Sequence, residues 1–154
     1  MYGRDVIVRY LQDAEAAERT FEDALASLSK AGDQPAVQSA LAGISGNARS
    51  QHERLHGRLE ALGAGGSSAK SALAHVLGFA PEVAQWGETE GQKSTQDLMI
   101  VIGAAAAESA MYEALAAAAA AAGDPATETL ARQLQDEERQ DYQRAQTLGC
   151  ATWA

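Results

Sequence analysis

The residues of this sequence that could do chemistry are carboxylates placed where a helix-period pattern calls for apolar side chains. Glu18 fills a gap in one apolar stripe, and Glu108 lies at the centre of an almost wholly apolar segment. Asp141 belongs to a third stripe, with Glu138 beside it. An isolated ionised carboxylate is costly to bury, so buried ones are normally paired or bound to metal.

Few basic residues are available to neutralise these carboxylates. The chain has 12 Lys and Arg against 21 Asp and Glu, a net charge of −9, and none of the basic residues lies on an inward stripe. The inward carboxylates must therefore be accommodated by a metal, by shared protons, by water or by access to solvent. A carboxylate-rich bundle core is the architecture of di-iron and di-manganese proteins, so the pattern indicates a candidate metal site.

Four long helix-period segments must position these side chains. The spacing predicts helices over about 5–30, 35–62, 95–122 and 125–148. Two similar junctions, Ala-Gly-Asp-Gln-Pro-Ala from Ala31 and Ala-Gly-Asp-Pro-Ala from Ala122, separate the members of each pair. In each junction glycine suits the left-handed position after a helix, and Asp33 or Asp124 is expected to cap the next helix, with proline in its first turn. Replacing either aspartate by alanine is expected to cost about 1 kcal/mol.

Each short junction closes an antiparallel helix pair, and a connection over about 63–94 joins the two pairs. An apolar patch at 72–79 could form a short covering helix within that connection. The sequence therefore predicts an all-α four-helix bundle, formed as one domain over 1–154, whose long crossover makes the second and third long helices parallel.

The inward face of each helix follows from a turn of about 100° per residue. The stripes are Ile7, Leu11, Ala14, Glu18, Phe21, Leu25 and Leu28; then Leu41, Ile44, Ala48, Leu55, Leu59 and Leu62; then Val101, Ala104, Glu108, Leu115 and Ala119; and Leu130, Leu134, Asp141, Ala145 and Leu148. Several polar residues lie at the edges of these stripes, namely Glu15, Glu22, Gln51, His52, Tyr112, Glu137 and Glu138. Tyr112 and Tyr142 either donate hydrogen bonds to the carboxylates or only pack, and packing is the favoured alternative.

Composition excludes several function classes. The sequence has 35 alanines and 5% aromatic residues, and the acidic balance without a basic cluster argues against nucleic-acid and anionic-membrane binding. A single cysteine, Cys150, excludes an internal disulfide and indicates a reducing compartment. The start of the chain lacks the apolar run of a signal peptide, and the apolar segment 98–122 contains Glu108 and Glu113. We expect a cytoplasmic protein in which that segment is a buried helix.

Several short motifs, in order, are similar to those of a known family. They are Asp13-Ala14-Glu15, Glu53-Arg54-Leu55, Glu60-Ala61-Leu62-Gly63, Glu108 with Tyr112, and Asp136-Glu137-Glu138. On these the chain resembles the ferritin-like superfamily, and within it the YciE/YciF-type bacterial stress proteins, over nearly all of residues 6–148. The resemblance implies a ferritin-like four-helix bundle.

The superfamily template implies particular ligands: Glu on the first and third helices, and Glu-X-X-His on the second and fourth. By resemblance, Glu15 or Glu18, Glu108, and Glu138 with Asp141 take ligand positions. The second helix departs from the template, because the offsets of Glu138 and Asp141 from their junction correspond to Ala48 and Gln51. Glu53 and His56 have the template spacing, but Glu53 faces away from the stripe, which leaves His52 as the substitute ligand.

Two functional hypotheses follow. The first is a stress-associated protein whose core binds iron or manganese, as one or two ions, in iron or peroxide handling. The second is a metal-free structural or interaction protein with a degenerate site. An enzymatic activity is left open. The sequence has no Ser-His-Asp order and no phosphate-binding loop, so any catalysis must come from a metal. The apolar segment 114–122 exceeds what one small bundle can bury, so we expect a homodimer.

Overall fold

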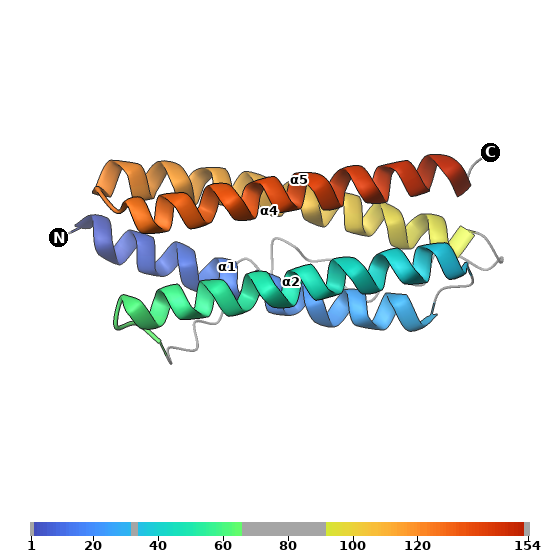
Figure 1. Ribbon diagram of the computed structural model, residues 1–154, viewed down its shortest axis with the longest axis horizontal. Helices are drawn as coiled ribbons and strands as arrows, with labels where there is room; N and C mark the ends of the chain where they lie inside the picture. Colours follow the sequence, from blue (N-terminus) through green and yellow to red (C-terminus); the bar gives the residue numbers. More distant parts are fainter. Residues whose placement is uncertain (1, 32–33, 66–91, 153–154) are drawn as a thin grey trace.

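A computed structural model describes residues 2–31, 34–65 and 92–152 of the chain. They form four long helices: α1 (Tyr2–Ala31), α2 (Pro35–Ala61), α4 (Gln92–Ala122) and α5 (Pro125–Thr152). Figure 1 shows two antiparallel pairs, α1 with α2 and α4 with α5, in which α2 and α4 run in the same direction. The predicted all-α four-helix bundle with one long crossover is confirmed.

The helix ends follow the junction chemistry at the α4–α5 turn. Gly123 has φ +70°, and the N–H of Asp124 donates to the carbonyl of Ala119 at 2.9 Å, which closes the end of α4. The Asp124 carboxylate accepts the N–H of Thr127 at 3.0 Å, so Asp124 caps α5 as expected. Asp33 lies outside the described residues. At the start of α2 the residue in the capping position is Gln34, whose side chain makes no capping hydrogen bond.

Three helices are longer than the apolar periodicity indicates. α1 begins at Tyr2, α4 begins at Gln92 and α5 extends to Thr152. The additional turns are polar or small in sequence, so the apolar stripe did not reveal them. The predicted covering helix at 72–79, and His75 within it, lie outside the described residues.

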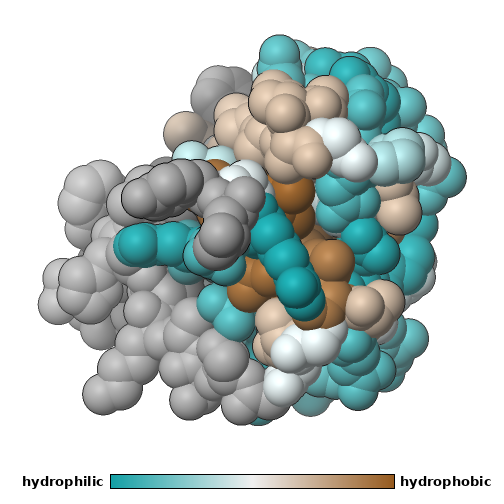
Figure 2. Space-filling view, turned by 90° about the vertical axis from the view of Figure 1, so that its left-hand side faces the viewer, coloured by the Kyte–Doolittle hydropathy of each residue, from teal (hydrophilic) through white to brown (hydrophobic). Residues whose placement is uncertain are grey.

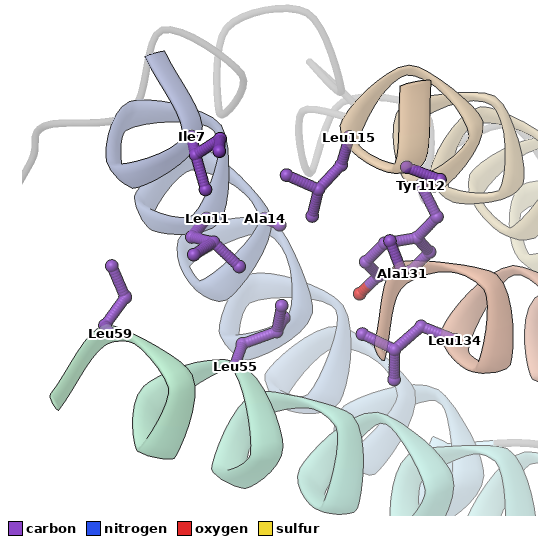
Figure 3. Packing of buried hydrophobic residues seen from close by; sticks show 10 residues of the cluster. Ile7, Leu11, Ala14, Leu55, Leu59, Tyr112, Leu115, Ala131 and Leu134 are labelled. Atoms are coloured by element: carbon purple, nitrogen blue, oxygen red, sulfur yellow. The ribbon is translucent and has the colours of Figure 1, made fainter. Parts of the chain in front are cut away.

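The core consists of two apolar clusters with a polar layer between them. One cluster is drawn in Figure 3 and contains Ile7, Leu11, Ala14, Leu55, Leu59, Tyr112, Leu115, Ala116, Ala131 and Leu134. The other contains Phe21, Leu25, Val37, Leu41, Ile44, Ala48, Leu98, Val101, Ala104 and Ala145. Along α1 and α4 the polar layer is formed by Glu18 and Glu108, which confirms the inward faces predicted for these residues.

Helix α4 is unusually apolar. Over Ser94–Ala122 it is, among the described residues, the one helix with the length and composition of a membrane span. Its stripe of Leu98, Val101, Ala104 and Leu115 is buried against the other helices, and it carries the buried Glu108. It therefore packs as a core helix of the bundle.

Candidate metal centre

Three glutamates from three helices meet at mid-height in the bundle. Glu18 of α1, Glu108 of α4 and Glu138 of α5 each offer a carboxylate oxygen within 4.8 Å of the other two. Their side chains are shielded from solvent, with 0%, 1% and 1% exposure respectively. Each glutamate occupies or borders an inward stripe of an amphipathic helix, so the fold itself brings them together.

No basic side chain neutralises this cluster. None of the ion pairs between described residues involves Glu18, Glu108 or Glu138. Glu18 Oε2, both carboxylate oxygens of Glu108, and Glu138 Oε2 are buried and accept no hydrogen bond from an N–H or O–H group of the described residues. A proton held between Glu108 and Glu138 forms a hydrogen bond that joins these two side chains. Unsatisfied buried acceptors of this kind are rare in folded proteins and call for an explanation.

Burial and mutual repulsion change the protonation of the cluster. Burial raises the pKa of Glu18 and of Glu108 well above the usual range, and the charge of Glu138 raises both further. Burial, followed by the charge of Asp141, raises the pKa of Glu138 to about 8. Without a bound cation, the cluster therefore retains protons near neutral pH.

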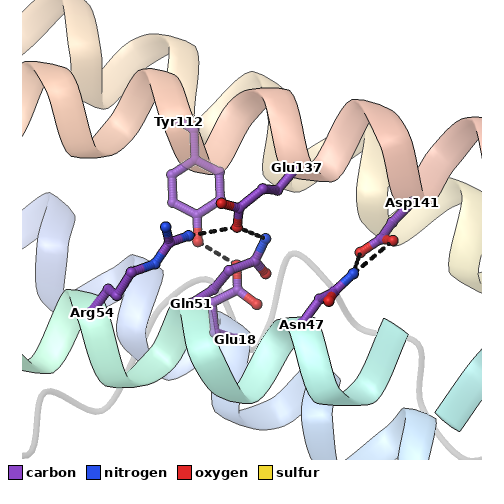
Figure 4. A network of polar contacts seen from close by, with 7 residues as sticks. All are labelled: Glu18, Asn47, Gln51, Arg54, Tyr112, Glu137 and Asp141. Atoms are coloured by element: carbon purple, nitrogen blue, oxygen red, sulfur yellow. Dashed lines mark hydrogen bonds and ion pairs between the residues drawn. The ribbon is translucent and has the colours of Figure 1, made fainter. Parts of the chain in front are cut away.

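Tyr112 contributes a hydrogen bond as well as packing. Its hydroxyl donates to Glu18 Oε1, and the whole side chain is buried (Figure 4). Burial, followed by the charges of Glu18 and Glu108, raises the pKa of Tyr112 well above its usual value, so the hydroxyl remains a donor. Of the two alternatives, the favoured one, that Tyr112 only packs, was wrong and the hydrogen-bond role is observed, because the edge position on α4 directs its hydroxyl across the bundle to α1.

Helix α2 adds an amide to the cluster instead of a carboxylate. Gln51 is completely buried, its Nε2 donates to Glu137 Oε2 at 3.2 Å, and its Oε1 has no partner (Figure 4). A hydrogen bond from Gln51 also lowers the pKa of Glu138, against the larger effect of burial. Ala48 lies in the apolar core. The helix-register argument thus located Gln51 correctly, but it did not recognise that the side-chain carbonyl oxygen of Gln51 could be a metal ligand.

Glu137 and Asp141 occupy the edge of the cluster. Glu137 Oε2 forms an ion pair with Arg54 Nη2 at 2.5 Å (Figure 4). Both carboxylate oxygens of Asp141 accept hydrogen bonds from Asn47 Nδ2 at 3.0 Å. Asp141 is buried, which raises its pKa, while the Asn47 hydrogen bonds and the charge of Arg144 lower it. Asp141 is absent from the group of oxygens that lie within 4.8 Å of one another.

The other two predicted ligands lie elsewhere. Glu15 Oε1 is 2.6 Å from His56 Nδ1 and 3.7 Å from His52 Nε2, so these three residues group between α1 and α2. Neither Glu15 nor His52 joins the buried group of carboxylates. Of the six predicted ligands, the structure brings together Glu18, Glu108 and Glu138.

A four-helix bundle with one long crossover and carboxylates converging at mid-height is a ferritin-like architecture. A family model described as Domain of unknown function (DUF892) matches residues 3–148. The chain therefore belongs to this family, and the resemblance to YciE/YciF-type proteins is confirmed. No curated protein matches the sequence significantly.

Solved structures with the same fold come from several bacteria. The E. coli stress protein YciF is 22% identical, with 97% of this chain and 96% of that chain covered and a TM-score of 0.86. YcfI from Rhodopseudomonas palustris, a candidate structural protein, is 20% identical, with 94% and 93% covered and a TM-score of 0.86. A protein from Xanthomonas campestris pv. campestris is 21% identical, with 97% and 92% covered and a TM-score of 0.78.

Proposed function

We propose that this protein binds one divalent iron or manganese ion at Glu18, Glu108 and Glu138. The observation that supports the proposal is the convergence of three buried carboxylates that form no ion pair with a described basic side chain and of which four oxygens accept no hydrogen bond from an N–H or O–H group. A divalent ion would satisfy those oxygens and offset most of the negative charge that burial otherwise disfavours.

The donor set fits a hard cation. Carboxylate and amide oxygens suit manganese, and carboxylates also hold iron in the di-iron members of this architecture. Gln51 Oε1 is a further neutral oxygen ligand from α2, and Tyr112 would hold Glu18 in place through its hydroxyl. Bound iron would supply one-electron redox chemistry; the residues of this chain bind the ion, orient the carboxylates and exclude water.

A single ion is favoured over a pair because of helix α2. A two-metal site in this architecture uses a carboxylate and an imidazole from each of two helices. In this chain the corresponding positions on α2 are Gln51 and Ala48, which offer one neutral oxygen between them.

The proposed physiological role follows from the family. YciF of E. coli is described as a stress protein, and a buried iron or manganese site would suit iron or peroxide handling under stress. We place the protein in the cytoplasm, consistent with its single cysteine and acidic surface.

A metal-free structural role is the second candidate. It is favoured by the raised pKa values of Glu18, Glu108 and Glu138, because protonated carboxyls can remain buried without a cation. The R. palustris relative is itself a candidate structural protein.

Metal stoichiometry separates the two candidates. Purified protein is loaded anaerobically with Fe(II) or Mn(II), passed through a desalting column and analysed for metal. We expect about one ion per chain in the wild type and almost none in Glu108→Gln, which preserves shape but removes a charge. Glu113→Gln, an exposed change on the same helix, is the matched control and should bind like the wild type.

Two results would contradict the proposal. A wild type that stays empty after loading favours the metal-free role, and two ions per chain would show that α2 supplies more than the sequence indicates. Circular dichroism of Glu108→Gln establishes that loss of metal is not loss of fold.

We further propose a homodimer formed through the outer face of α4. This face is a continuous surface of exposed alanines, with Ala106, Ala110, Ala114, Ala117 and Ala121 among them. Small side chains of this kind permit close approach of two helices, and burying them would remove apolar surface from water. Sedimentation analysis should give a dimer, and a monomer at high micromolar concentration would rule it out.

A further inference from the structure

One carboxylate on the α1–α2 face touches two imidazoles. Glu15 of α1 places Oε1 2.6 Å from His56 Nδ1 and 3.7 Å from His52 Nε2, both on α2. The three side chains are partly exposed, at 20% for Glu15, 28% for His52 and 48% for His56. A solvent ion can therefore reach them without opening the bundle.

The two histidines lie on the face of α2 that meets Glu15 of α1. They stand four residues apart on α2, which puts them one turn apart on the same face of the helix. Two imidazole nitrogens and one carboxylate oxygen form the mixed donor set that zinc and copper accept, in contrast to the oxygen-only set of the buried cluster.

The contacts are close to those that a metal requires. Zinc–ligand bonds of about 2.0–2.1 Å in a tetrahedron separate neighbouring ligand atoms by about 3.3 Å. The two contacts of Glu15 Oε1, at 2.6 and 3.7 Å, bracket that separation. The three ligand atoms do not all lie within 4.8 Å of one another, so the two partly exposed imidazoles must turn toward each other to share an ion, with water completing the coordination.

Glu60 supports the required tautomer of His56. Its Oε1 lies 3.5 Å from His56 Nε2, on the opposite side of the ring from Glu15. A carboxylate in that position accepts the N–H of one ring nitrogen and leaves the other as a ligand, which is the usual arrangement around metal-bound histidine.

We propose that Glu15, His52 and His56 form a second metal site, specific for a borderline divalent ion of the zinc and copper class. The ion replaces the proton shared by Glu15 and His56 and links α1 to α2. The site is separate from the buried carboxylates and does not depend on them for its ligands.

The proposal is tested by titrating tag-free protein with Zn²⁺ by calorimetry. We expect one zinc site, weakened at least about tenfold in His52→Asn and in His56→Asn, because each removes a direct ligand. Glu53→Gln removes a charge from the same helix without touching either imidazole, so it should bind zinc as the wild type does. Unchanged zinc affinity in both histidine variants would overturn the proposal.

A second measurement keeps this site distinct from the buried one. Cu²⁺ is added to Glu108→Gln and observed by electron paramagnetic resonance, where imidazole ligands produce nitrogen hyperfine splitting. We expect two-nitrogen coupling that persists in Glu108→Gln and decreases in His56→Asn. Two-nitrogen coupling that is unchanged in His56→Asn would contradict the proposed ligands, and coupling that disappears in Glu108→Gln would contradict a surface site independent of the core.

Discussion

Two groups of charged side chains cross between helices in this bundle, and the pKa values of their carboxyl groups are shifted in opposite directions. At mid-height, Glu18, Glu108 and Glu138 meet with no ion pair to a basic side chain of the described residues, and their pKa values are raised. At the end of the bundle, Asp124 also joins two helices, but Arg58 lies against it. The comparison shows how a basic partner changes the pKa of a carboxyl group within the same fold.

The Asp124 group is fully paired. Arg58 Nη2 donates to both Asp124 oxygens at 2.8 Å and Arg58 Nε donates to Thr127 at 2.8 Å, so α2 is tied to the α4–α5 turn. Burial acts to raise the pKa of Asp124, but hydrogen bonds from Thr127 and Arg58 together outweigh it and lower the pKa to about 2.

The surroundings of that group are open. Figure 2 views this end of the bundle, where hydrophilic side chains cross an apolar centre. A hollow of about 270 Å³ lies there, lined in part by Arg4, Ile7, Arg58 and Leu62. The group is therefore structural: its charges satisfy one another and leave no free oxygen for a ligand. The mid-height carboxylates have the opposite property, which is why we assign function to them.

The largest expected effect is that the metal-free protein loses stability as pH rises from about 5 to 8. Folded Glu138 keeps its proton up to a pKa of about 8, whereas an unfolded glutamate loses it near 4.5. Between those values the folded state binds more protons, so stability falls by about 1.4 kcal/mol per pH unit for each excess proton. Urea denaturation of chelator-treated protein at several pH values measures this slope.

The Asp124 group supplies the contrasting pH range. The pKa of Asp124 is lowered in the folded state, so the stabilisation from this group is present above about pH 4 and is lost as pH falls toward 2.

Glu138→Gln should flatten the slope above pH 5 and leave the acid range unchanged. A flat or rising profile between pH 5 and 8 in the wild type would be incompatible with a protonated metal-free cluster.

A smaller effect is expected when the missing carboxylate is restored on α2. Gln51→Glu adds a fourth acid to the cluster of Glu18, Glu108 and Glu138, which should lower metal-free stability at pH 8 by about 1–3 kcal/mol. It should also tighten manganese binding by about tenfold or more, since it adds a charged oxygen ligand. Gln133→Glu on the exposed face of α5 is the control. Unaltered affinity in Gln51→Glu would mean that Gln51 does not face the ion.

The smallest effect concerns the paired group. Asp124→Ala removes the α5 cap and the partner of Arg58, and it should cost about 1–2 kcal/mol at pH 7. Asp136→Ala, which removes an exposed ion pair with Arg139, should change stability by less than about 0.5 kcal/mol. Equal changes in the two variants would show that the Asp124 contacts add nothing beyond a surface charge.

The sequence by itself determined the helices, their pairing and two of the three core carboxylates. Glu18 and Glu108 each occupy an inward position set by the 3.6-residue period, so their burial could be predicted without knowing any neighbour. Asp124 could be predicted as a cap because capping depends on local backbone geometry alone.

Only the tertiary structure decided the residues at the edges of the stripes. Glu137 and Glu138 are consecutive, yet Glu138 points into the cluster while Glu137 pairs with Arg54. Glu15 lies one turn from Glu18 but contacts the histidines of α2. The helical period gives the direction of an edge side chain only approximately, and the rotation and packing of the neighbouring helices determine which group it meets.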